Sequence, residues 1–364
     1  MAKTPKILTG LDIDPSGIAA VVAILALDPG FLPEAPAAAE VRVNGSISVS
    51  RAATAPLEPG VLRDGEVVDS AGLTEALRGL WRDNKGLGKR VRVGVANQKI
   101  VVRILHVPPT QTEAELDAAV RFQAQDQLPM PLDKAVIDYV PFAPDPAAED
   151  AGRRVLLVAA RRDMVENLLN AVRAAGLKPM GIDLAAFAMV RALRLRSLDE
   201  EPVLYLAIGG LANIAVAQGR QCIFTRVSGS GLDGMIVDLA EREQLTLDHS
   251  RGWLSHVGLV EPVEEIEGDA QIVASARQVL LEGVRRIGAE VRNSLDFHTM
   301  SGGSGTVSRA VVTGPAAAVP GFAEALQSEL SLPVERGVVA GAPDGIDASE
   351  ITVAAGLAVQ EVSA

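Results

Sequence analysis

The sequence predicts an α/β protein made of two related halves, with a smaller β-α-β-β-α unit inserted into the first half. The main evidence is a strand, turn and strand pattern over residues 7–27, which recurs over residues 203–231 with a Gly-rich turn between its first two strands. A pattern that occurs twice at this distance indicates an internal duplication. Residues 99–177 carry a separate order of strand, helix, two strands and helix, which is typical of an inserted subdomain.

In the first half, residues 7–12 and 18–27 read as strands joined by an Asp-Pro-Ser-Gly turn, because these residue types favour turns. The next apolar segment contains Asn44-Gly45, a dipeptide that favours two-residue hairpin turns. We therefore expect another hairpin there, followed by a helix near residues 72–84 and a strand in RVRVGVANQ, residues 90–98. This order predicts a mixed sheet.

The inserted unit contains a helix that begins after Thr112, where Glu115 three residues later completes a capping box. Pro129 and Pro131 end this helix. We expect the first half to comprise residues 1–98, 178–198 and a C-terminal helix, capped by Ser349, over residues 349–364. The insertion then covers residues 99–177 and the second half covers residues 199–348.

The composition excludes several classes of function. A net charge of −12 and a pI near 4.9 argue against broad binding to nucleic acid or to anionic lipid. The start of the chain carries aspartates where a signal peptide would be apolar, and the apolar run over residues 18–27 is half of the roughly 20 residues that a spanning helix needs. A single cysteine, Cys222, fits a reducing compartment. We expect a soluble, cytoplasmic protein.

The opening segment GLDIDPSG has three chemical interpretations. A calcium loop would use Asp12, Asp14 and Ser16, but its twelfth position would be Ala23 instead of a glutamate. A phosphatase of the haloacid dehalogenase type would use the first aspartate to attack phosphorus, yet no lysine occurs after Lys178. The remaining interpretation is a β-hairpin whose backbone N–H groups hold phosphates while an aspartate meets Mg²⁺.

Five segments in order along the chain resemble the PilM family, the FtsA-related proteins of type IV pilus assembly, with the cytoplasmic domain of the type II secretion L protein as a cousin. The segments are GLDIDPSGIAAVVA, VRILHVPPTQTEAELDAAVRFQAQDQLPMPLDKAVIDY, VLLVAARRDMVENLLNAVRAAGLKP, LYLAIGGLANIAVAQGRQCIFTRVSGSG and AVVTGPAAAVPGFAEALQSELSLPVE. The resemblance implies an actin-like ATPase fold, which is a duplicated ribonuclease H-like fold with two lobes.

The resemblance further implies ATP and Mg²⁺ between the lobes, with Asp12 as the metal ligand. The residues that it assigns to the nucleotide site come from three loops and are Asp12, Asp14, Ser16, Gly17, Gly209, Gly210, Asn213, Thr313 and Gly314.

The three loops also depart from the family pattern. Asp14 replaces the glycine of the first Asp-x-Gly, Ala207 replaces the acid of the second, and Pro315 replaces a glycine in the adenine loop. The helix after GLDGM lacks the family's acid and lysine pattern. We expect a degenerate pocket, empty or weakly bound and without hydrolysis. The alternative is an active ATPase, filament former or small-molecule kinase, although residues 202–232 hold no acid to accept a substrate proton.

The family resemblance also implies a scaffold at the inner membrane. A groove between the first subdomain and the insertion would bind the N-terminal cytoplasmic tail of a PilN-like inner-membrane protein, with Arg103, Phe122 and Gln123 as candidate contacts. Pilus assembly ATPases are further expected partners, nucleic acid is not, and the protein would reach the membrane only through its partner.

Overall fold

The structure is a computed structural model that describes residues 8–25, 41–110, 112–142, 152–194, 201–219, 221–300 and 305–359. Residues 143–151 and residues 360–364, the last part of the predicted C-terminal helix, lie outside the described residues. Among the described residues, no helix combines the length and the apolar character needed to cross a membrane.

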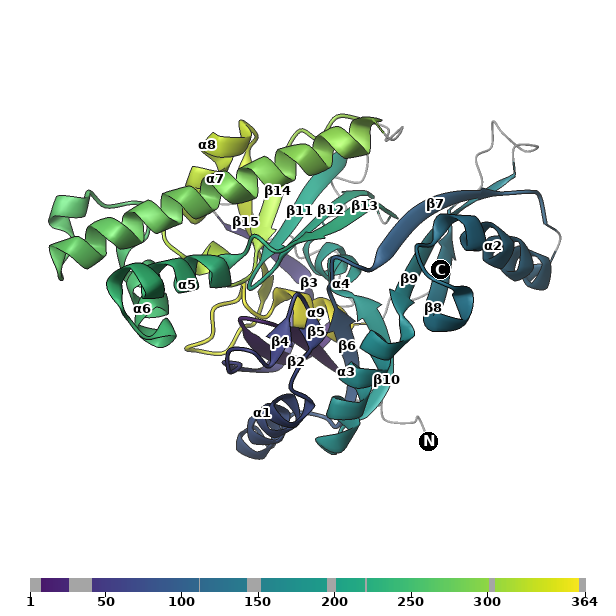
Figure 1. Ribbon diagram of the computed structural model, residues 1–364, viewed down its shortest axis with the longest axis horizontal. Coiled ribbons are helices and arrows are strands. Elements are labelled where there is room, and N and C mark those ends of the chain that lie inside the picture. Colours follow the sequence, from purple (N-terminus) through teal and green to yellow (C-terminus); the bar gives the residue numbers. More distant parts are fainter. Residues whose placement is uncertain are drawn as a thin grey trace.

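Most strands of the described residues form one ten-stranded sheet through the centre of the molecule (Figure 1). In spatial order its members are β10 (Lys178–Leu184), β6 (Arg90–Val95), β1 (Thr9–Asp14), β2 (Gly17–Leu25), β3 (Val41–Ala55), β15 (Val334–Ala340), β14 (Ala310–Thr313), β11 (Pro202–Ile208), β12 (Ala212–Gln218) and β13 (Gln221–Ser228).

The sheet consists of two five-stranded units with the same topology. In the first unit, β1 pairs antiparallel with β2 and parallel with β6, and β6 pairs parallel with β10. In the second unit, β11 pairs antiparallel with β12 and parallel with β14, and β14 pairs parallel with β15. β3 joins the two units by pairing with β15. The predicted internal duplication is therefore present in the strand order itself.

Helices cover both faces of the sheet. The helices α4 (Ala185–Leu193) and α9 (Thr352–Ala358) lie on a face shared by both units, where they pack on Val21 of β2 and Tyr205 of β11. The opposite face carries α1 (Ser70–Asp83) and α3 (Arg162–Ala174) over the first unit. Over the second unit it carries α5 (Leu232–Glu243), α6 (Leu247–Val257), α7 (Ala270–Met300) and α8 (Phe322–Leu330).

A second, three-stranded antiparallel sheet projects from one end of the molecule (Figure 1). It contains β7 (Val101–Val107), β9 (Arg153–Arg161) and β8 (Ala135–Pro141) in that spatial order, and α2 (Glu113–Gln127) packs on one of its faces. The order β7, α2, β8, β9, α3 is the expected β-α-β-β-α. The last helix, α3, packs into the core of the first unit, and the division of the chain into domains stays a prediction.

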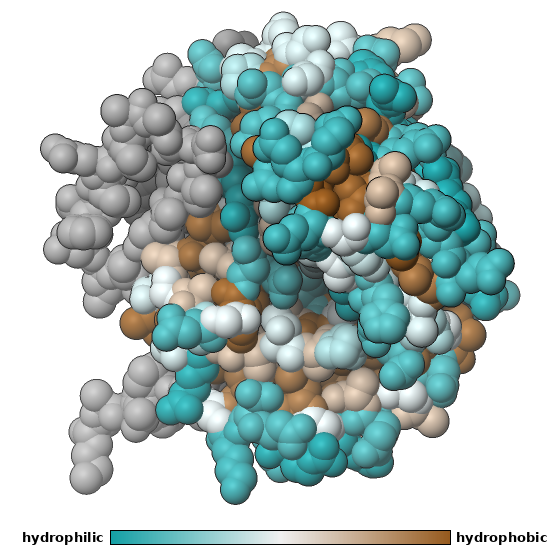
Figure 2. Space-filling model, turned by 90° about the vertical axis from the view of Figure 1, so that its left-hand side faces the viewer, coloured by the Kyte–Doolittle hydropathy of each residue, from teal (hydrophilic) through white to brown (hydrophobic). Residues whose placement is uncertain are grey.

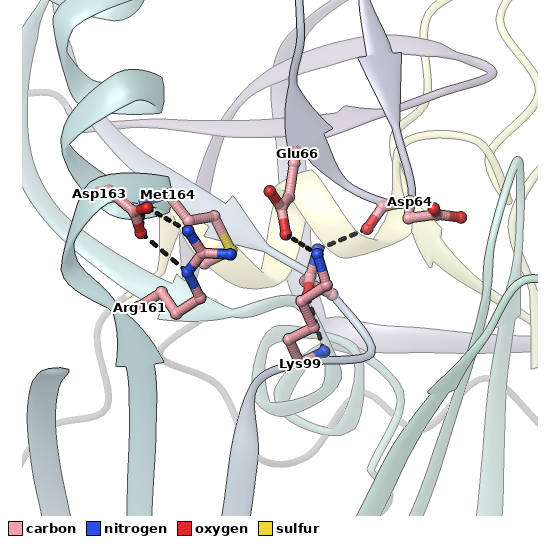
Figure 3. Close-up of polar contacts among 7 residues, drawn as sticks. Asp64, Glu66, Lys99, Arg161, Asp163 and Met164 are labelled. Atoms are coloured by element: carbon pink, nitrogen blue, oxygen red, sulfur yellow. Dashed lines mark hydrogen bonds and ion pairs between the residues drawn. The ribbon is translucent and has the colours of Figure 1, made fainter. Parts of the chain in front are cut away.

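Polar contacts hold the small sheet where the chain enters and leaves it (Figure 3). Lys99, just before β7, forms an ion pair with Glu66 of the short hairpin β4 (Leu62–Arg63) and β5 (Glu66–Val67), at 2.7 Å between Nζ and Oε1. Arg161, the last residue of β9, pairs with Asp163 in the first turn of α3. The insertion thus has fixed attachment points next to the first unit.

Two local predictions are wrong. β3 continues through Asn44-Gly45 without a turn, because residues 41–44 pair with β15 and residues 47–55 pair with β2. Ser349 does not cap α9, whose preceding residue is Ile351. The Ser349 hydroxyl instead donates to the carboxylate of Asp347. In β3, pairing with distant strands overrides the local preference for a turn, whereas Ser349 is held by a carboxylate two residues away.

Candidate nucleotide cleft and partner groove

A cavity of about 530 Å³ lies between the two sheet units, where the β1–β2 turn, the β11–β12 turn and the loop after β14 meet. Figure 2 views the molecule from the side of α5 and α6, and this face is hollowed near its centre. Most of the predicted nucleotide residues line the cavity: Asp12, Asp14, Ser16, Gly17, Gly209, Asn213 and Gly314. The structure therefore brings the three predicted loops together, while their role in binding stays a prediction.

The opening turn is a tight hairpin in which Asp14 and Gly17 pair and Pro15 and Ser16 form the turn. The Asp14 side chain folds over this turn. Its Oδ1 atom accepts hydrogen bonds from the Ser16 backbone N–H at 2.9 Å and from the Ser16 hydroxyl at 2.6 Å. The carboxylate therefore uses the donors of its own turn.

The same carboxylate reaches the second half of the molecule. Asp14 Oδ1 accepts the backbone N–H of Gly210 at 2.5 Å, and Oδ2 lies 3.4 Å from the backbone nitrogen of Leu211. This close approach requires glycine in the β11–β12 turn, since a Cβ on Gly209 would lie 2.8 Å from Asp14 Oδ1. A Cβ on Gly210 would lie 2.9 Å from the same oxygen. The two turns are thus linked through one side chain.

Two further carboxylates lie beside Asp14. Burial, assisted by the Asp14 charge, raises the pKa of Asp12 to about 7. Burial and Asp14 likewise raise the pKa of Asp233, in the first turn of α5, to about 6. Asp233 was not predicted, because it follows the acid-free segment 202–232 by one residue and approaches the site only through the fold. Three carboxyl groups, those of Asp12, Asp14 and Asp233, are therefore close enough together near the turns to influence one another.

Unsatisfied polar atoms mark the same end of the cavity. Asn213 is 6% exposed and lines the cavity, and its Oδ1 atom accepts no hydrogen bond from the described residues. Asp233 Oδ1 is also buried and has no hydrogen-bond partner among the described residues. Across the described residues, no group of three histidine, cysteine or acidic side chains could hold a metal ion, so the role of Asp12 as a metal ligand stays a prediction.

The other wall of the cavity comes from α6. Asp248 and Arg251 both line it, and their i, i+3 spacing places them on one face of the helix. This pair was not predicted from the sequence, because the family pattern at this helix is an acid with a lysine. An acid with arginine lines the cavity here. Arg251 brings a positive charge to a cavity with several acids.

The loop after β14 is tied to the C-terminal segment. Thr313 is fully buried, and its hydroxyl donates to the Ser349 carbonyl oxygen at 3.2 Å. The Gly314 N–H donates to the same oxygen at 3.1 Å, and Pro315, which has no N–H, opens the following 3₁₀ turn (Pro315–Ala318). The Gly314 N–H group is thus already hydrogen-bonded within the protein.

Whether a triphosphate with Mg²⁺ binds among these residues stays a prediction. The backbone N–H groups that would face phosphate oxygens are taken by Asp14, and Asp12 and Asp233 surround the same place. Like charges at such short range repel strongly where water is largely excluded. Ala207, which lines the cavity, offers no carboxylate for a metal.

A second, more apolar cavity of about 430 Å³ separates the small sheet from the first unit. We call it the groove. On one side it is lined by β8 and by Leu156, Val158 and Ala160 of β9, and on the other by β10 and α4, with Gln221 and Cys222 of β13 at its edge. Alternate residues of β9, such as Val155 and Leu157, face α2 instead, so both faces of this strand are apolar.

The groove is bordered by free strand edges. In the described part of the chain, β8 is the edge strand of the small sheet and β10 is the edge strand of the large one. Val140 of β8 is 56% exposed at the groove. On the facing wall, the Arg191 guanidinium donates to the Asp183 carboxylate and to the Gly356 carbonyl oxygen, both at 2.8 Å. This pair joins the groove to α9.

The predicted partner contacts lie elsewhere. Arg103, Phe122 and Gln123 are not among the residues that line the groove. Phe122 is 70% exposed on α2, and the Gln123 amide donates to the His106 carbonyl oxygen at 2.7 Å. A signal for the groove was present in the unbroken apolar run of β9, because α2 covers just one face of that strand.

Two repeats of one five-stranded unit around a central cleft, with a subdomain in the first repeat, define an actin-like protein. Solved structures agree. The chain is 23% identical to a structure described as the "PilM-PilN type IV pilus biogenesis complex", with a TM-score of 0.75 over 97% of this chain and 98% of that one. It also matches the ethanolamine utilization protein EutJ from Carboxydothermus hydrogenoformans (15% identity, TM-score 0.52, 98% and 91% coverage). A third match is ADP-bound MreB5 of Spiroplasma citri (14%, 0.52, 97% and 95%).

A family model narrows this class. The model of the type IV pilus assembly protein PilM matches residues 37–250, more than half of the chain. The chain belongs to this family of type IV pilus assembly proteins, and its actin-like fold is confirmed.

Proposed function

We propose that this protein is a scaffold of the type IV pilus inner-membrane platform and binds the N-terminal cytoplasmic tail of a PilN-like protein in the groove. The observation that carries the proposal is the groove itself, an apolar cavity between two free strand edges. A short peptide in extended conformation can add to such an edge by main-chain hydrogen bonds, with its side chains in the apolar cavity. The similar structure described as a PilM-PilN complex supports this partner.

In this proposal the protein stays in the cytoplasm and reaches the inner membrane through that partner. Pilus assembly ATPases remain proposed further partners. The central cleft is proposed to be degenerate, holding ATP and Mg²⁺ weakly or not at all. A thermal shift with ATP and Mg²⁺ tests this point, since 1 mM of a ligand with a micromolar Kd would stabilise the fold by about 4 kcal/mol. A melting temperature that does not move would support the degenerate cleft, and a shift of several degrees would contradict it.

The peptide proposal is tested by calorimetric titration with a synthetic tail of the PilN-like protein of the same organism. Val140→Asp places a charge at the groove where Val140 is largely exposed, so we expect the fold to survive and the peptide affinity to fall at least tenfold. The matched control is Phe122→Asp, an apolar position on α2 that is more exposed than Val140 and lies outside the groove. Equal affinities for both variants would contradict the proposed site.

A further inference from the structure

The Asp14 carboxylate lies at the junction of the two structural repeats. The β1–β2 turn and the β11–β12 turn occupy equivalent places in the two five-stranded units. In the space between them, a single oxygen, Asp14 Oδ1, receives two backbone N–H groups, one from each turn, together with the Ser16 hydroxyl. Convergent backbone N–H groups of this kind commonly form an anion-binding site.

The residues around the Asp14 carboxylate leave space for it. Gly209 and Gly210 leave room for a carboxylate oxygen, as a Cβ at either residue would come within 3 Å of it. A ligand phosphate would need the same N–H groups and the same space. The Asp14 carboxylate and a phosphate group therefore compete for one anion-binding position. Because Asp14 is part of the chain, it does not dissociate from this position as a ligand would.

We propose that Asp14 is a built-in substitute for a ligand phosphate, which links the two halves across the cleft and bars nucleoside triphosphates from it. The inference goes beyond the scaffold function and does not depend on peptide binding in the groove. In this proposal one side chain holds the two turns together, at the centre of a fold in which another protein is described with ADP bound.

The proposal is tested in the full chain with Asp14→Gly and Asp14→Asn. Binding of ATP with Mg²⁺ and of adenosine is measured by calorimetry, and amide hydrogen exchange is measured at Ser16 and Gly210. We expect Asp14→Gly to bind ATP at least tenfold more tightly than the original chain, with no such gain for adenosine. In Asp14→Asn, which keeps the size of the side chain and loses its charge, both amides should exchange at least tenfold faster.

The matched control is Asp69→Ala. Asp69 also accepts two backbone N–H groups, from Ala71 and Gly72 at 3.0 Å, but within the N-terminus of α1. It should change neither ATP binding nor exchange at Gly210. Unchanged exchange in Asp14→Asn, unchanged ATP affinity in Asp14→Gly, or an equal gain for adenosine would each overturn the proposal. If Asp14→Gly does not fold, amide exchange at Ser16 and Gly210 in Asp14→Asn decides the proposal, and titration with the tail peptide separates this failure from that of the groove proposal.

Discussion

Gly10, in the middle of β1, is the position where one added methyl group should disturb the fold most clearly. A Cβ there would overlap the Ala354 carbonyl oxygen and lie 2.6 Å from the Ala358 nitrogen. These are backbone atoms of α9, so no side-chain rotation can relieve the clash, and the helix has to move. Because α9 is buried along its whole length, we expect Gly10→Ala to lower the free energy of unfolding by about 3 kcal/mol, at the upper end of overpacking costs.

Urea unfolding followed by circular dichroism measures this change. The control is Gly181→Ala in β10, where a Cβ would meet nothing within 4 Å, and which we expect to change stability by less than about 1 kcal/mol. A shift of α9 should also disturb Arg191, which donates to the Gly356 carbonyl oxygen from the groove wall. Gly10→Ala should therefore weaken peptide binding. A stability within 0.5 kcal/mol of the Gly181→Ala variant, roughly the error of such comparisons, would refute the reasoning.

Three further predictions follow from single side chains. Thr112→Ala removes the capping box of α2 and should cost about 1 kcal/mol in urea unfolding, whereas an unchanged midpoint would contradict the cap's contribution. Since the pKa of Asp12 is raised to about 7, the folded state holds a proton that the unfolded state releases. In metal-free buffer, stability should therefore fall by about 1–2 kcal/mol between pH 5 and pH 8, and Asp12→Asn should remove most of this fall. We place the change below the roughly 4 kcal/mol limit of the full shift, because Asp12 also lines the cavity; a flat pH profile would contradict it. Cys222 lies at the edge of the groove but is mostly buried, and burial raises the pKa of its thiol to about 12; it should react with a thiol reagent at least tenfold more slowly than a free thiol, and labelling at the rate of a free thiol would contradict this.

Local sequence patterns predicted those parts of the fold whose conformation is decided by residues close together in the sequence. The turn after Asp14, the capping box of Thr112 and the repeated strand pattern all depend on residues a few positions apart. The Asn44-Gly45 turn failed for the opposite reason, since pairing of β3 with strands on both sides decided its conformation.

The candidate sites depended more on contacts between distant residues. Sequence placed Asp14 in the cleft and indicated that it would repel phosphate. It did not show that Asp14 would bond to Gly210, 196 positions away. Asp233 joined the same site through the start of α5. The sequence predicted a groove beside the insertion but not its lining residues, because Val140 and Arg191 line one cavity only after the insertion has packed beside the first unit.

Photo-crosslinking of the PilN-like tail is the most direct test of whether this peptide binds in the groove. A benzophenone placed at each apolar position of the synthetic peptide marks the residues that the bound peptide touches, and mass spectrometry of the digested protein locates them. If the peptide lies in the groove, crosslinks should fall on β8 and on residues 182–194 of β10 and α4, which line its two sides. Crosslinks concentrated on α2, or on the turns around the central cleft, would contradict it.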